Sequence, residues 1–87
     1  MRTVNVLPNK VHILAFCWSQ QQGKHCLVGS DMSFYFVDAG SQKPVLCSFY
    51  YDLLQSQVWY SELLGCWMTT GSDGKIRLWK FQRYSQE

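Results

Sequence analysis

Short segments of alternating or continuous apolar residues recur along the chain, and polar loops separate them. In 75–79, Ile76 and Leu78 alternate with Lys75, Arg77 and Trp79, which is the period of a β-strand. By this pattern, strands are predicted at 2–7, 11–19, 25–30, 33–38, 45–51, 58–61, 66–71 and 75–81. The intervening residues 20–24 and 39–44 are polar or contain Gly and Pro, as hairpin loops do. The chain is therefore predicted to be all-β.

One stretch, 50–64, fits two secondary structures. Tyr51, Leu54 and Val58 have the spacing of one face of a helix. An internal repeat, described next, favours a strand at 58–61 instead. We adopt the strand, with the helix as the alternative.

A Gly-Ser-Asp turn occurs twice, at 29–31 and at 71–73, so the two copies are 42 residues apart. Gly and Asp are typical turn residues, since Gly tolerates positive φ and Asp bonds nearby backbone. Further pairs at the same spacing are Ser19 and Ser61, Trp18 and Tyr60, Phe16 and Val58, Phe34 and Ile76, and Phe36 and Leu78. A period of about 40–45 residues is that of a four-stranded propeller blade.

The stretch from Thr70 to Trp79, with the sequence Thr-Gly-Ser-Asp-Gly-Lys-Ile-Arg-Leu-Trp, resembles the WD-repeat β-propeller family. The resemblance implies two blades, each an antiparallel four-stranded meander. These would be a first blade at about 11–51, an incomplete second blade at about 57–81, a strand of a neighbouring blade in 1–10 and a tail at 82–87. The first copy departs from the family because Val37 stands in place of the Trp, and both copies lack the Gly-His pair that usually opens a repeat.

The second turn carries the residues of a polar network. The Asp73 carboxylate can accept backbone N–H groups of the turn, and the Trp79 indole N–H requires a partner when buried. The hydroxyl of Thr70 or Ser72 could bridge them. In the first turn, Asp31 has no Trp opposite it. We therefore expect loss of Asp73 to destabilise the protein more than loss of Asp31.

Length and composition disagree about how complete the fold is. The chain has 87 residues, of which 47% are apolar. In 26–28 and 34–37 both faces of the strand are apolar, which is typical of strands covered on both sides. Two blades leave two outer faces without a neighbour. The chain is therefore expected to be part of a larger propeller or a short isoform, with further blades as partners, and to associate or aggregate in isolation.

Charge and motifs argue against catalysis, cofactors and nucleic acid. The formal net charge of +2 is too small to indicate a nucleic-acid surface. The sequence has no Gly-x-Ser-x-Gly motif, glycine-rich phosphate loop or paired carboxylates, so neither an enzyme nor a cofactor is expected. The spacing of His12, His25, Cys17 and Cys26 matches no common metal-ligand pattern.

The four cysteines indicate a reducing compartment. They lie in apolar strand segments without Cys-x-x-Cys spacing, at positions 17, 26, 47 and 66. The sequence shows neither a secretory signal pattern nor an apolar run long enough to cross a membrane. Free, buried thiols and an intracellular location, cytoplasmic or nuclear and away from membranes, are expected.

The family resemblance implies a protein–protein interaction scaffold. In the family, one rim carries the loops after the second and fourth strands, which here are 31–33, 73–75 and about 52–56. The residues expected to contact a partner are Met32, Ser33, Asp52 and Lys75. Two alternatives remain. One is a small RNA-binding β-sheet domain, which needs two helices and basic signature residues; the other is a structural fragment with no independent activity.

Overall fold

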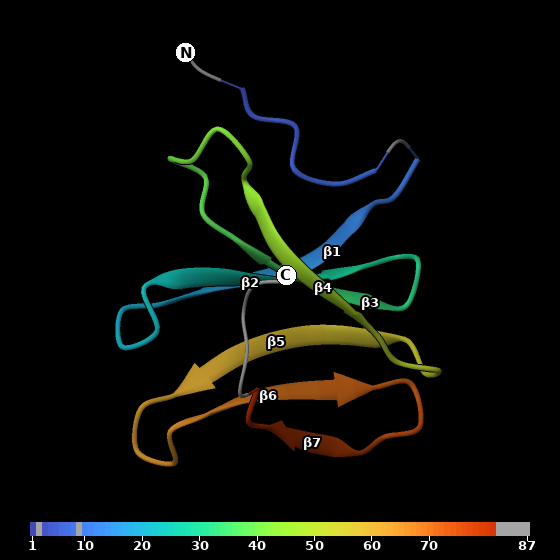
Figure 1. Ribbon diagram of the computed structural model, residues 1–87. Helices are drawn as coiled ribbons and strands as arrows, with labels where there is room; N and C mark the ends of the chain where they lie inside the picture. Colours follow the sequence, from blue (N-terminus) through green and yellow to red (C-terminus); the bar gives the residue numbers. More distant parts are fainter. Residues whose placement is uncertain (2, 9, 82–87) are drawn as a thin grey trace.

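The computed structural model describes residues 1, 3–8 and 10–81, and these form two antiparallel sheets without a helix (Figure 1). The strands are β1 (Ile13–Ser19), β2 (Lys24–Gly29), β3 (Ser33–Val37), β4 (Val45–Tyr50), β5 (Gln55–Ser61), β6 (Cys66–Gly71) and β7 (Ile76–Trp79). The first sheet has the order β1-β2-β3-β4 and the second the order β5-β6-β7. The all-β prediction is confirmed. Because β5 occupies 55–61, the helical alternative for 50–64 is wrong.

The strand predicted at 2–7 does not form among the described residues 3–7. The segment lies over the first sheet, where Val6 and Leu7 pack against the side chains of Leu27, Tyr35 and Val37. It covers the sheet with side chains and forms no strand ladder there. Residue 2 and the predicted tail at 82–87 lie outside the described residues.

The 42-residue repeat is present in the backbone of both sheets. The β1–β2 hairpin is closed by Ser19, whose Oγ accepts the N–H of Gln22 at 3.0 Å. The β5–β6 hairpin is closed in the same way by Ser61, whose Oγ accepts the N–H of Leu64 at 3.1 Å. Each ladder also has a register shift at its start, between residues 13 and 15 in β1 and between residues 55 and 57 in β5. The first three strands of each sheet therefore follow one plan.

The two sheets stack, with β5 against β1 and β2 (Figure 1). Aromatic rings fill the space between them. The Phe36 ring is fully buried and its edge meets Trp67, with 5.7 Å between centroids. Phe34 meets Trp79 at 5.0 Å. This stacking places the connections between strands at two opposite ends of the molecule.

Candidate interaction rim

Three connections lie together at one end of the stacked sheets (Figure 1). They are the turn between β2 and β3, the β4–β5 connection and the turn between β6 and β7. Hydrogen bonds join them: the Tyr51 N–H donates to the Met32 carbonyl at 2.9 Å, and the Ser72 N–H donates to the Leu54 carbonyl at 3.2 Å. We call residues 31–33, 50–54 and 72–75 the rim.

The predicted loop at 52–56 is shorter than expected. Gln55 and Ser56 already belong to β5, and Gln55 is buried. The Gln55 side chain donates to the Leu53 carbonyl at 3.1 Å, which ties the start of the strand to the connection. Only residues up to Leu54 are therefore available as a loop.

Met32, Tyr50 and Asp52 form one exposed cluster on the rim. The Tyr50 hydroxyl donates to the Asp52 carboxylate at 3.2 Å and lies 3.9 Å from the Met32 sulfur. The neighbouring Asp52 carboxylate raises the pKa of the Tyr50 phenol. Two of these residues were predicted from the sequence and Tyr50 was not. The predicted strand at 45–51 hid Tyr50, and only the structure shows it as the last residue of β4, directly before the connection.

Lys75 and Ser33 occupy corresponding positions in the two turns and differ in exposure. The Lys75 side chain is exposed, and its N–H donates to Asp73 Oδ1 at 3.3 Å. Ser33 is half-buried, and its N–H donates to Asp31 Oδ1 at 3.2 Å. Lys75 is therefore displayed on the rim, whereas Ser33 serves the turn itself.

Asp31 has a side-chain partner that the sequence analysis did not anticipate. The hydroxyl of the buried Tyr35 donates a hydrogen bond to the Asp31 carboxylate. Burial, with a further contribution from the bond to Asp31, raises the pKa of the Tyr35 phenol to about 12. The premise that Asp31 lacks a side-chain donor is wrong, because it considered only Val37, the residue at the position of the family Trp.

Asp73 is held by Arg77 in a bidentate ion pair. The two Nη–H groups donate to the two carboxylate oxygens at 3.0 and 2.7 Å. These hydrogen bonds lower the pKa of Asp73 to about 2. Arg77 Nε also donates to the Tyr51 hydroxyl at 3.0 Å, and the guanidinium carbon lies 5.5 Å from the centre of the Tyr51 ring. Arg77 thereby connects the second sheet to the β4–β5 connection.

The partner of the Trp79 indole is Thr69, not Thr70 or Ser72. Trp79 Nε1–H donates to Thr69 Oγ1 at 2.8 Å, and the Thr69 hydroxyl donates to Gln55 Oε1 at 2.7 Å. Thr70 points to the other side of the sheet, where it meets the Ser56 hydroxyl at 3.2 Å. The alternation of side chains along a strand accounts for the correction, since adjacent residues point to opposite faces.

The described part of the chain shows no other constellation that suggests chemistry. No group of three or more His, Cys, Asp or Glu side chains in it could hold a metal ion. The four cysteines are unpaired in the structure, and burial raises the pKa of the Cys26 and Cys47 thiols. None of its secondary structure is a helix with the length and apolar character needed to cross a membrane.

Comparisons with models of protein families, with curated proteins and with solved structures find no match for this chain.

Proposed function

We propose that the two sheets are WD-like propeller blades, the second with three strands among the described residues, and that the chain acts as a protein–protein interaction scaffold. The support comes from the 42-residue repeat, which recurs in the hairpin hydrogen bonds, the register shifts and the turns of both sheets. The segment from Thr70 to Trp79 carries the family resemblance. No catalytic step is part of this proposal.

The binding surface in this proposal is the rim. The observation that carries it is the exposed cluster of Met32, Tyr50 and Asp52 on backbone that hydrogen bonds hold between the two sheets. Loops on a rigid scaffold are where binding residues concentrate. A thioether and a phenol provide adaptable apolar contact. Lys75 and Asp52 add one charge of each sign, so the expected partner is a protein segment with an apolar anchor flanked by polar groups.

The RNA-binding alternative has less support. That domain requires two helices packed on its sheet, and the described residues contain none. Its stacking aromatics must be free on the sheet surface, whereas Phe34 and Phe36 are buried between the two sheets.

Affinity capture from cell lysate with the full chain tests the proposal. The rim variant carries Met32→Ala and Lys75→Glu, and a second rim variant carries Tyr50→Ala. The control, Gln42→Ala with Lys43→Glu, changes two exposed residues of the β3–β4 loop at the opposite end. Gln21 is not a suitable control, since its side chain accepts a hydrogen bond from Tyr60 at 2.7 Å.

The rim variants should lose most of the captured partners, and the control should retain them. Capture that survives both rim variants, or that is lost only in the control, would contradict the proposal by placing the interface away from the rim. A wild type that captures no partner would contradict it as well and support the view that the chain is a structural fragment.

A further inference from the structure

The two sheets stack head to tail, so each uses a different face in the contact. Each sheet has a face A, with Phe34 and Phe36 in the first sheet and the equivalent Ile76 and Leu78 in the second. The opposite face B has Phe16 and His25 in the first sheet and the equivalent Val58 and Trp67 in the second. Face A of the first sheet packs on face B of the second sheet: their residues share one core cluster, in which Phe34, Phe36, Val58 and Trp67 are between 0% and 7% exposed.

The complementary pair of faces lies at the two ends of the stack: face A of the second sheet is open, and face B of the first sheet is partly covered by Val6 and Leu7. On face A of the second sheet, Ile76 is 60% and Leu78 59% exposed. On face B of the first sheet, Phe16 is 68% exposed. A hollow of about 220 Å³ lies beside Phe16, and His25, Leu27 and Val37 also line it. In the internal contact, the corresponding region of the second sheet is filled by Phe34 and Phe36.

We propose that a second copy of this chain docks head to tail on the first, with face A of the second sheet of one copy on face B of the first sheet of the next. The occupant is a second copy because the chain carries both halves of a contact that it already makes within itself. Ile76 and Leu78 stand at the positions of Phe34 and Phe36, and they would enter the hollow beside Phe16. Such a contact joins unlike faces, so it leaves a free face at each end and can repeat.

The N-terminal segment 3–8 has a part in this docking. In the repeat it corresponds to 45–50, which is β4, and β4 pairs with β3 to complete the first sheet. In the second sheet β7 is an edge strand, with β6 as its only neighbour among the described strands. An unpaired edge is a template for a further strand. In the first sheet, Phe49 lies opposite Phe34 and Cys47 opposite Phe36. The 42-residue repeat relates these pairs to Leu7 opposite Ile76 and Asn5 opposite Leu78, where Leu7 and Asn5 come from the second copy.

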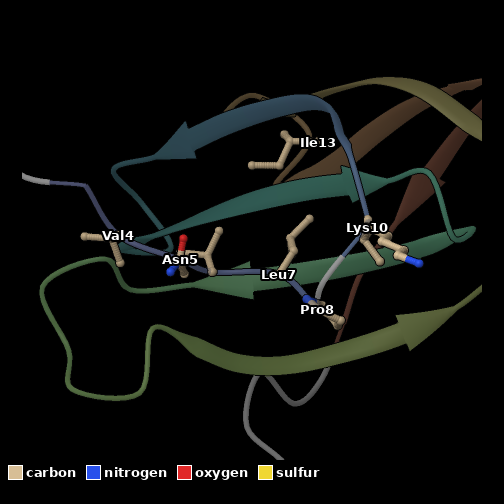
Figure 2. A pocket seen from close by; sticks show the side chains of 8 residues that line it. Val4, Asn5, Leu7, Pro8, Lys10 and Ile13 are labelled. Atoms are coloured by element: carbon tan, nitrogen blue, oxygen red, sulfur yellow. The ribbon is translucent and has the colours of Figure 1, made fainter.

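The position of segment 3–8 in a single copy is consistent with its transfer to β7 of another copy. Figure 2 shows the segment from Val4 to Pro8 passing over the first sheet, with Ile13 on the far side of an open hollow. The hollow measures about 530 Å³. Val6 and Leu7 cover part of face B in the same copy. Docking therefore requires the segment to leave its own first sheet and pair with β7 of the other copy.

Sedimentation of the full chain over a range of concentrations tests the proposal. The wild type should show masses at multiples of 10.2 kDa that rise with concentration. Leu78→Glu blocks face A, and Phe16→Glu blocks face B. Each variant alone should remain at 10.2 kDa. An equimolar mixture of the two has one intact pair of faces and should form a one-to-one dimer. The matched control is Leu63→Glu in the β5–β6 loop, at a residue that is 95% exposed and lies on neither face; it should associate like the wild type.

Hydrogen exchange provides the second measurement. Amides of 76–79 should gain protection as the wild type associates, and they should show no such gain in Leu78→Glu. Far-UV circular dichroism verifies that each variant keeps its β-sheet, and Ile76→Lys replaces Leu78→Glu if the latter unfolds. A wild type that stays at 10.2 kDa would overturn the proposal. Single variants that still associate, or a mixture that does not form a dimer, would overturn it equally. Because neither Leu78 nor Phe16 belongs to the rim, these outcomes are independent of the partner-capture experiment.

Discussion

The turn between β2 and β3 and the turn between β6 and β7 share a backbone and differ in chemistry. In each, the carbonyl of the first Gly accepts an N–H three residues later at 3.2 Å, at Gly29 and at Gly71. In each, the turn Asp Oδ1 accepts the backbone N–H two residues later. The residue at positive φ is Met32 in the first turn and Gly74 in the second. The carboxylate is then held by the neutral phenol of Tyr35 in the first turn and by a guanidinium in the second.

The strands next to these turns also differ in chemistry at equivalent positions. The second sheet has a hydrogen-bonded trio of Gln55, Thr69 and Trp79. The repeat places three apolar residues, Ile13, Leu27 and Val37, at the same positions of the first sheet. The Trp79 donor must be satisfied because its ring is packed against Phe34 of the other sheet. At equivalent positions, the second sheet therefore uses hydrogen-bonded polar side chains and the first sheet uses apolar ones. The experiments below compare the contributions of the two sheets to stability.

The largest difference is expected between Phe36 and its repeat equivalent Leu78. Phe36→Ala removes a fully buried ring from the core between the sheets and should cost about 3–5 kcal/mol of unfolding free energy. Leu78→Ala changes an exposed side chain and should stay within about 0.5 kcal/mol in dilute solution. Urea unfolding of both variants measures this. Similar costs at the two positions would mean that the sheets are not stacked head to tail.

The polar trio provides the next test. Thr69→Val keeps the shape of the side chain and leaves the Trp79 indole N–H and the Gln55 side-chain Oε1 without their partner, so it should cost about 1–3 kcal/mol. Thr70→Val, on the opposite face of the same strand, is the control and should cost clearly less. Were the control to cost as much as Thr69→Val in the same urea titration, the trio would not be the source of the effect.

The two turn carboxylates should rank opposite to the order expected from the sequence. Asp31→Ala leaves the hydroxyl of buried Tyr35 without its acceptor, and this should cost about 1 kcal/mol. Asp73→Ala breaks a partly exposed ion pair at the surface, a kind of contact that contributes little, so its effect should be smaller. Thermal unfolding of both variants decides the order. The double variants with Tyr35→Phe and Arg77→Gln show whether each Asp acts through its partner.

The smallest effects are in the pH dependence, where the two turns should respond at opposite ends of the scale. The pKa of Asp73 is lowered to about 2 from 3.8, so its contribution to stability is complete above pH 3.8 and is lost as the pH falls toward 2. The pKa of Tyr35 is raised to about 12 from 10.0, so its contribution is complete below pH 10 and is lost as the pH rises toward 12.

Unfolding midpoints measured from pH 2 to 12 test both limbs of this dependence. Arg77→Gln should flatten the acid limb, and Tyr35→Phe the alkaline limb. An acid limb that is unchanged in Arg77→Gln would show that the ion pair does not contribute to stability.

Local patterns in the sequence were sufficient for the parts of the fold that depend on short-range chemistry. The alternation around Ile76 and Leu78 predicted a strand, the Gly-Ser-Asp turns predicted hairpins, and the 42-residue spacing correctly favoured a strand at 58–61 over a helix. These features are encoded locally, because turns and side-chain alternation depend on residues close together in the chain.

Only the tertiary structure decided which groups meet. Whether 3–7 becomes a strand depends on an available edge, and in this structure the segment packs its side chains on the first sheet. The choice of Thr69 over Thr70 depends on which face of β6 meets the first sheet. The Tyr35 and Arg77 partners of the turn carboxylates lie four residues away along the chain. Their settings come from distant segments, because Tyr35 is buried under Val6 and Leu7, and Arg77 is anchored by Tyr51 of the β4–β5 connection. A hydrogen bond forms where packing removes water from the competing sites, and packing is a property of the assembled sheets rather than of any one segment.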